Sequence, residues 1–332
     1  MEDQQTIFIS LSCLLDSSIL ETIADAFEKA SFPNNLRFGI YFAYDPEDDF
    51  LTLYDGHPQF RIHRVPYQES LGPTHARYLT SQLLQEEDFY LQIDCHTRFY
   101  PDWDRMACQM WSECSDTKAI LSCFPVPIRV MDDWQNYGMN CSTPTFDQLS
   151  LTAIKLEKVR IKYTGKTRPN YYLSDSFVFG PSSFLTEVPF DPNFTHYDRK
   201  MTQQFYAIRL FTHGWNIYMP PRYLVATSYG QTPLLLRNGQ KVTIPYHPQV
   251  EQASWERILH YYGINELPNI PPEYGLGTIR PLNDFFRLHQ EDQAIEKLKL
   301  KRIWKTPNWK TPLQGEHQGE HQGEHQGERP LP

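Results

Sequence analysis

Short apolar runs alternate with an amphipathic stretch at the start of the chain. Residues 6–11 and 36–42 are apolar runs of strand length. Between them, Asp16 opens a stretch with apolar residues at helical spacing, and Pro33 ends it. The predicted apolar face of this helix consists of Leu20, Ile23, Ala24 and Phe27. Strand, helix and strand at these lengths predict a βαβ unit and hence a parallel sheet.

The same alternation continues to residue 93. Residues 60–65 form a third predicted strand, residues 74–85 a helix that follows Gly72-Pro73, and residues 89–93 a buried strand. This is the front half of a nucleotide-binding α/β domain. It lacks the glycine-rich motifs of dinucleotide enzymes and P-loop proteins, so strand-end side chains and Arg77 would have to hold a nucleotide. Alternatively, Arg77 is a solvent-facing helical arginine.

Further elements follow the central strand. Trp103 begins an amphipathic helix, and residues 119–124 form a strand. Residues 132–172 read as irregular. A helix over residues 200–211 ends at Gly214, which is a good C-cap. The remaining elements are apolar segments at 177–180 and 184–191, a strand at 215–220, and helices near 253–262 and 282–288.

The strand at residues 89–93 runs directly into Asp94 and His96. Strands of α/β proteins deliver side chains to the carboxyl edge of the sheet, where ligands bind. In extended backbone, residues separated by one position point the same way. A carboxylate and an imidazole on one side are two ligands for a divalent cation. Alternatively, Asp94 caps a turn and His96 is a surface residue.

Charge and composition narrow the function classes. The chain has 332 residues, 40% of them hydrophobic, which suffices for one large or two modest domains. A net charge of −9 argues against a protein that coats nucleic acid or anionic lipid. Residues 1–5 lack a basic n-region, and no run approaches the roughly 20 apolar residues of a membrane span. We therefore expect a cytoplasmic protein without membrane or nucleic-acid partners.

The six cysteines show no zinc-type spacing, so free thiols are expected. Cys95 beside His96 suggests a nucleophile and base, but adjacent residues of a strand face opposite ways, which disfavours that interpretation. In the tail, Gly315-Glu316-His317-Gln318 recurs at 319–322 and 323–326. These repeats contain no apolar residue, so disordered low-complexity sequence is expected. Their histidines either bind metal weakly or have no function.

Six segments together resemble one family. They resemble cytoplasmic polypeptide N-acetylglucosaminyltransferases of the type that glycosylates a hydroxyproline on a ubiquitin-ligase adaptor, together with bacterial relatives. The segments occur in family order between Ile7 and about Leu288. They are Leu36-Arg37-Phe38-Gly39-Ile40, Ala76-Arg77-Tyr78-Leu79, Tyr90-Leu91-Gln92-Ile93-Asp94-Cys95-His96-Thr97-Arg98-Phe99, Glu187-Val188-Pro189-Phe190-Asp191-Pro192, Arg209-Leu210-Phe211-Thr212-His213-Gly214-Trp215 and Tyr274-Gly275-Leu276-Gly277-Thr278-Ile279-Arg280.

The resemblance implies an α/β fold of the GT-A glycosyltransferase type, with a Rossmann-like sheet for the nucleotide sugar. It places a catalytic domain at residues 1–290, with a donor half to about 125 and an acceptor half from about 126. An extension at 291–313 and the low-complexity tail at 314–332 follow. It implies transfer of N-acetylglucosamine from UDP-GlcNAc to a protein or glycan hydroxyl, with retention of configuration.

The resemblance also implies roles for individual residues. Asp94 and His96 fall on the family's metal motif and would hold Mn²⁺ or Mg²⁺, which neutralises charge on the leaving group. Arg77 would add a positive contact to the diphosphate. The predicted donor-binding residues are Ser10, Asp16, Arg77 and Gln92, and the predicted catalytic residues are Gln203 and His213.

The chain departs from the family pattern at three places. Two family glutamates are replaced by Thr202 and Gln203, and Gln203 cannot act as a base. No third metal-binding histidine occurs in residues 224–229, and Leu15 stands where the family tends to have arginine. A binding module that has lost catalysis, and a nucleotide-sugar hydrolase, therefore remain alternatives to a transferase. Aromatic residues at 132–172 either stack on the acceptor or cover the sheet.

Overall fold

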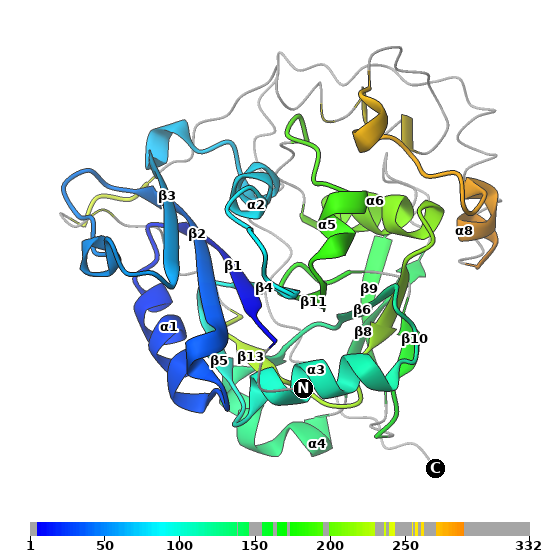
Figure 1. Ribbon diagram of the computed structural model, residues 1–332, viewed down its shortest axis with the longest axis horizontal. Coiled ribbons are helices and arrows are strands. Elements are labelled where there is room, and N and C mark those ends of the chain that lie inside the picture. Colours follow the sequence, from blue (N-terminus) through cyan, green and yellow to red (C-terminus); the bar gives the residue numbers. More distant parts are fainter. Residues whose placement is uncertain are drawn as a thin grey trace.

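The computed structural model describes residues 5–137, 139–145, 155–161, 165–170, 173–194, 199–229, 236, 239–242, 254, 256–257, 260–261 and 270–288. Their centre is an eight-stranded sheet in the order β10-β12-β6-β11-β4-β1-β2-β3 (Figure 1). In the part of the chain just defined, no helix combines the length and the apolar character needed to cross a membrane.

Four consecutive strands form the parallel half of the sheet. They are β1 (Ile7–Leu14), β2 (Leu36–Tyr44), β3 (Phe60–Pro66) and β4 (Phe89–Asp94). β1 lies between β2 and β4, and all three neighbouring pairs are parallel. The apolar runs and the βαβ connection therefore predicted this half correctly.

The other half of the sheet is mixed. β11 (Phe177–Pro181) pairs antiparallel with both β4 and β6 (Ala119–Ser122). β12 (Asn216–Met219) is parallel to β6, and β10 (Arg168–Asn170) pairs antiparallel with β12. Because β11 reverses direction against both neighbours, β6 and β12 run the same way as β4. The carboxyl ends of β1, β4, β6 and β12 consequently share one edge, which we call the carboxyl edge.

Helices cover both faces of the sheet (Figure 1). Residues of α1 (Ser18–Lys29) and α3 (Trp103–Glu113) pack with Ile7, Ile9 and Leu11 of β1. On the opposite face, α5 (Ser183–Glu187) and α6 (Arg199–Thr212) pack against Phe8 of β1 and Tyr90 of β4. The remaining helices are α2 (Pro73–Ser81), which contacts β1 and β2, α4 (Trp134–Tyr137), α8 (Leu282–Leu288), which contacts α6, and the short 3-10 helices Pro33–Asn35, Thr52–Tyr54, Tyr67–Glu69, Ile128–Asp133 and Pro272–Tyr274.

The apolar face predicted for α1 was partly wrong. The helix buries Ile19, Thr22, Ile23 and Ala26, whereas Ala24 is exposed. The helix begins at Ser18, so that Ile19 rather than Leu20 starts the buried stripe. Thr22 belongs to this stripe because its hydroxyl group has a structural task at the site described below.

The prediction of irregular structure over residues 132–172 was also wrong. β8 (Met139–Thr145) and β9 (Lys155–Ile161) form an antiparallel pair, and α4 and β10 lie in the same stretch. The polar residues of β8 and β9 concealed two strands that form a separate two-stranded sheet among the described residues. A third sheet joins β5 (Thr97–Phe99), β13 (Val225–Thr227) and β7 (Val126–Pro127).

Two predictions concern the end of the chain. The described residues of the helix predicted at 253–262 are helical. The extension at 291–313 and the tail at 314–332 lie outside the described residues.

The sheet is continuous across the boundary predicted near residue 125 between a donor half and an acceptor half, since β10, β11 and β12 join strands from the first half.

The segment around Gly277 is bound tightly to the end of α6. The amides of Gly277 and Ile279 donate to the Thr212 hydroxyl and carbonyl oxygens at 2.9 and 3.0 Å. A Cβ on Gly277 would lie 2.5 Å from the Thr212 carbonyl carbon and 2.6 Å from the His213 nitrogen. Both are backbone atoms, so the steric clash could be removed only if the segment around Gly277 moved away from the end of α6.

We expect Gly277→Ala to lower the free energy of unfolding by about 1–3 kcal/mol, the usual cost of overpacking. Urea denaturation measures the change, with Thr278→Ala as control because Thr278 is exposed. Equal effects of the two substitutions would contradict a tight contact at Gly277.

Candidate active site

A sharp turn follows β1 at the carboxyl edge of the sheet. Leu15 has a φ of 54°, in the left-handed region that non-glycine residues rarely occupy. Its amide donates to the carbonyl of Ala43 at 3.0 Å, which fixes the turn against β2. Asp16 follows, and its Oδ1 accepts a hydrogen bond from the Ser18 amide at 3.0 Å. Strained backbone of this kind concentrates at functional sites.

A second turn follows β4. Cys95 and His96 form this turn before β5 begins at Thr97. The Thr22 hydroxyl of α1 donates to the Cys95 carbonyl at 2.7 Å and accepts from the Thr97 amide at 2.9 Å. The Thr97 hydroxyl also donates to the Asp94 carbonyl at 2.7 Å. These bonds hold the backbone of the turn in place from both sides.

The two turns bring Asp16, Cys95 and His96 together. His96 Nδ1 lies 3.1 Å from Asp16 Oδ2, and Cys95 Sγ lies 3.5 Å from the same oxygen. Cys95 Sγ is 3.8 Å from His96 Nδ1. Extended backbone was assumed from Asp94 to His96, and that assumption was wrong because the chain turns at Cys95. Cys95 and His96 therefore do approach each other, contrary to the sequence argument.

The contact between Asp16 and His96 shifts the pKa of both. Burial acts to raise the pKa of Asp16, but hydrogen bonds with His96 and Ser18 outweigh it and lower the pKa. The hydrogen bond with Asp16, reinforced by Cys95, raises the pKa of His96 to about 10. At neutral pH His96 is thus protonated, and a metal ion that bound it would release that proton.

Asp94 is the last residue of β4 and lies opposite Ser12 of β1. It is half-buried, and its charge helps to raise the pKa of His96. His96 bonds to Asp16, however, and the group of potential metal ligands found among the described residues consists of Asp16, Cys95 and His96. Gln92 and Asp94 lie two residues apart on one strand and so share a face of the sheet.

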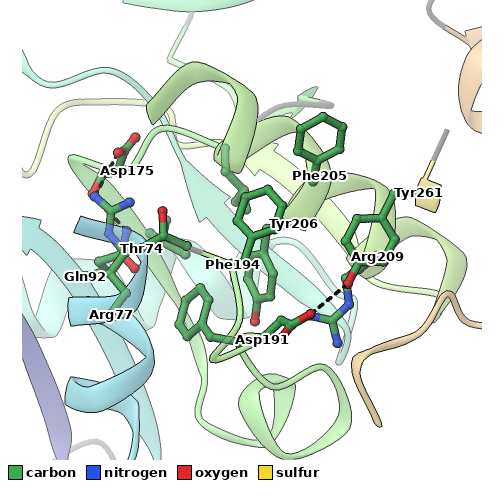
Figure 2. Close-up of a pocket in the computed structure, with 13 residues that line it drawn as sticks. Thr74, Arg77, Gln92, Asp175, Asp191, Phe194, Phe205, Tyr206, Arg209 and Tyr261 are labelled. Carbon is green, nitrogen blue, oxygen red and sulfur yellow. Dashed lines mark hydrogen bonds and ion pairs between the residues drawn. The ribbon is translucent and has the colours of Figure 1, made fainter. Parts of the chain in front are cut away.

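A pocket adjoins this face of β4 and is lined from α2, α6 and the turn before β11 (Figure 2). Arg77 Nη2 forms an ion pair with Asp175 Oδ2 at 2.8 Å, although the atoms are not aligned as a hydrogen bond. Gln92 Nε2 donates to the Asp175 carbonyl at 2.9 Å. Arg77 is 8% exposed, so the alternative of a solvent-facing arginine was wrong.

The opposite wall of the pocket contains a second buried ion pair and several rings. Asp191 Oδ2 lies 2.6 Å from Arg257 Nη1 and 3.5 Å from the Tyr261 hydroxyl, which donates to the Tyr274 carbonyl at 2.6 Å. Aromatic rings lie between the pair Arg77 and Asp175 and the carboxylate of Asp191 (Figure 2). They belong to Phe190, Phe194, Phe205 and Tyr206. Such a lining suits a polar ligand with apolar faces.

The remaining predicted site residues lie apart from the turn at Cys95. The Ser10 hydroxyl is buried and donates to Thr80 Oγ1 at 2.8 Å. Gln203 lies in the N-terminal half of α6, and its side chain is outside the described part of the structure. α6 turns at Gly214 directly into β12, so the two elements run in opposite directions. Gln203 therefore lies toward the carboxyl edge.

His213 lies at the other edge of the sheet. It precedes β12, whose first residue pairs with the first residue of β6. Its Nδ1 donates to the Arg209 carbonyl at 2.8 Å. The structure thus brings together Asp16, Asp94 and His96 at one edge and Arg77 with Gln92 in the pocket, and it separates His213 from both.

Asp175 was missed by the sequence reasoning. It stands in a polar turn, Ser174-Asp175-Ser176, immediately before the apolar strand β11. This polar turn could have indicated a site residue, but its position at the carboxyl edge follows only if β11 runs antiparallel to β4. The pairing starts at Phe177 opposite Ile93, which puts the preceding turn at the carboxyl edge.

Comparison with known proteins gives a family and a fold. The profile of the family described as Glycosyltransferase (GlcNAc) matches residues 51–294. No curated protein matches the chain in sequence. Two solved structures share its GT-A fold. GalNAc-T7 with UDP, GalNAc and Mn²⁺ has a TM-score of 0.54 and 12% identity, over 90% of this chain and 57% of that one. S. aureus TarS 1-349 has a TM-score of 0.53 and 10% identity, over 95% and 77%. The chain thus spans little more than half the length of GalNAc-T7.

Proposed function

This chain belongs to the Glycosyltransferase (GlcNAc) family, and we propose that it transfers N-acetylglucosamine from UDP-GlcNAc to a hydroxyl group of a protein or glycan. One observation carries the proposal. Asp16, Asp94 and His96 gather where the parallel strands β1 and β4 end, beside a pocket lined by polar groups and rings. Nucleotide ligands of open α/β sheets bind outside the carboxyl ends of the strands.

The proposed reaction retains the anomeric configuration. The bond from the sugar C1 to the diphosphate oxygen breaks, and a bond from C1 to the acceptor oxygen forms on the same face. The acceptor proton passes to the departing phosphate, so no protein carboxylate need act as base, which agrees with glutamine at position 203. Asp94 and His96 offer the oxygen and nitrogen ligands that suit Mn²⁺ or Mg²⁺. Such an ion stabilises charge on the leaving diphosphate.

The pocket supplies the sugar contacts in this proposal. Arg77 pairs with Asp175, and Asp191 pairs with Arg257. Arg209 also lines the pocket, and its guanidinium donates to backbone carbonyls, so the walls offer polar atoms and a positive charge. Thr74 Oγ1 is buried and has no hydrogen-bond partner among the described atoms. It is therefore a candidate to bond a sugar hydroxyl. The geometry of His213 favours a structural role at the end of α6 over the catalytic role first predicted.

The function is tested by incubating the protein with several nucleotide sugars and Mn²⁺, with and without a pool of protein acceptors. A transferase releases UDP from UDP-GlcNAc faster when acceptor is present and labels the acceptor. Equal release without acceptor identifies a hydrolase. Nucleotide binding without any release identifies a binding module and contradicts our proposal.

We expect UDP to bind much more tightly with Mn²⁺ than in EDTA, because in this proposal Asp94 and His96 would hold the ion together with the diphosphate. Asp94→Ala should bring the ratio of the two dissociation constants to about one, since a site with so few protein ligands depends on each. Isothermal titration calorimetry measures both constants. Asp132→Ala removes an exposed carboxylate and serves as control. Equal affinity of the unchanged protein with and without Mn²⁺ would exclude this metal role.

A further inference from the structure

We propose that Asp16, Cys95 and His96 form a binding site for a thiolate-binding transition-metal ion such as Zn²⁺. The site uses a cysteine thiolate and requires no nucleotide, so it goes beyond the proposed transfer reaction. It shares His96 with the proposed Mn²⁺ site, so the two ions would compete for that imidazole. Three ligand atoms converge within 4.8 Å of one another: Asp16 Oδ2, Cys95 Sγ and His96 Nδ1.

The distances between these atoms match one face of a zinc tetrahedron. Zinc bonds of about 2.0 Å to oxygen, 2.05 Å to nitrogen and 2.3 Å to sulfur give tetrahedral edges of about 3.3 Å (N–O), 3.5 Å (O–S) and 3.6 Å (N–S). The observed edges are 3.1, 3.5 and 3.8 Å in the same order. A tetrahedral ion placed behind the centre of this face would need only small side-chain adjustments, and its fourth position would remain open.

The ligand atoms are held in place before any ion arrives. Ser18 occupies Oδ1 of Asp16 and leaves Oδ2 directed at the other two ligands. The turn that carries Cys95 and His96 is fixed by the Thr22 hydroxyl. The side chains of His96 and Asp16 are 30% and 27% exposed, which leaves a path from solvent.

Binding exchanges protons for the ion. The thiol of Cys95 and the imidazolium of His96 each lose one proton to the solvent as their sulfur and nitrogen bond to the metal. A thiolate ligand favours Zn²⁺, Co²⁺ or Cd²⁺ over Mn²⁺ and Mg²⁺. Ion choice therefore distinguishes this site from the pair Asp94 and His96, which would hold a hard ion through the diphosphate.

Titration of the metal-free full chain with Co²⁺, without nucleotide, tests the proposal. We expect one ion per chain with the intense visible absorption of tetrahedral Co²⁺ and a near-ultraviolet sulfur-to-cobalt charge-transfer band. Cys95→Ser should abolish the charge-transfer band and weaken Zn²⁺ binding by at least about 100-fold, since losing even a residue that only hydrogen-bonds to a metal ligand costs about 10–100-fold. Histidines of the tail repeats can bind Co²⁺ but cannot produce a sulfur band.

Cys123→Ser is the matched control, because Cys123 is also buried but directly follows β6, outside the three-residue group. It should keep both spectral features. Asp16→Asn should weaken binding while the sulfur band remains at high Co²⁺, which covers the case in which Cys95→Ser fails to fold. A chain without a sulfur band, or a band that persists in Cys95→Ser, would overturn the site. Neither result depends on whether UDP-GlcNAc is bound or turned over.

Discussion

Replacing Arg209 with methionine should lower the free energy of unfolding by about 3 kcal/mol or more. Arg209 is 2% exposed, and its guanidinium donates to three backbone carbonyls. These belong to Pro189 at 2.6 Å, Glu273 at 2.8 Å and Gly275 at 3.3 Å. Methionine fills similar volume but donates nothing, and each buried carbonyl left without a partner costs about 1–3 kcal/mol.

The same contacts give Arg209 a role in forming the pocket. Three of the segments that resemble the family meet at its guanidinium: the segment that begins at Arg209, the segment 187–192, and the segment 274–280. Chemical denaturation measures the loss of stability. Arg287→Met is the control, because the Arg287 side chain is 69% exposed and should change stability by less than about 0.5 kcal/mol. Similar losses in both variants would contradict the importance of the buried bonds.

Introducing glutamate at position 203 should raise turnover by about ten- to a hundredfold with little change in donor affinity. The resembled family has two glutamates where this chain has Thr202 and Gln203. A charge-assisted hydrogen bond is worth about 1.5–3 kcal/mol. If this hydrogen bond acts only in the transition state, its loss slows the reaction by about ten- to a hundredfold. Position 203 lies in the half of α6 that points to the carboxyl edge, beside the pocket.

Initial-rate kinetics and UDP calorimetry separate turnover from binding. Gln204→Glu is the matched control, since it adds the same charge about 100° further round the helix. No transfer and no hydrolysis by either the unchanged protein or Gln203→Glu, with binding intact, would identify a binding module. A lower rate in Gln203→Glu would show that Gln203 is adapted to a different sugar or acceptor.

The sequence predicted the parallel half of the fold because β1, β2 and β4 are mostly apolar runs and β3 alternates apolar with polar residues. The run at residues 36–42 is buried on both faces as part of β2 and could hardly be read otherwise. β11 was visible as an apolar segment, but its place between β4 and β6 was not. Strand pairing of that kind depends on packing between distant segments, which leaves no local pattern. β8 and β9 escaped notice because a polar pair of strands lacks the alternation used to detect it.

The candidate site was predicted by residue but not by arrangement. Asp16 and His96 were identified separately, and their contact across 80 residues depends on the left-handed Leu15 and on the turn at Cys95. We assumed that side chains alternate along a strand from Asp94 to His96, but the strand ends at Asp94 and the chain turns at Cys95. Asp175 was missed because its position follows from the direction of β11. The residue types of the site could thus be predicted from the sequence, whereas the contacts that depend on turns and on strand pairing could not.

The position of β11 also bears on how the chain folds during synthesis. β1 to β4 are complete by residue 94, whereas the strand that covers the free edge of β4 begins at Phe177. At roughly 5–20 residues per second, translation of the intervening segment takes about 4–17 s. Throughout that time the hydrogen-bonding groups on the edge of β4 that faces away from β1 have no native partner. A nascent chain of this protein therefore presents a pairing edge to other chains, and chaperone demand should peak between those two points of synthesis.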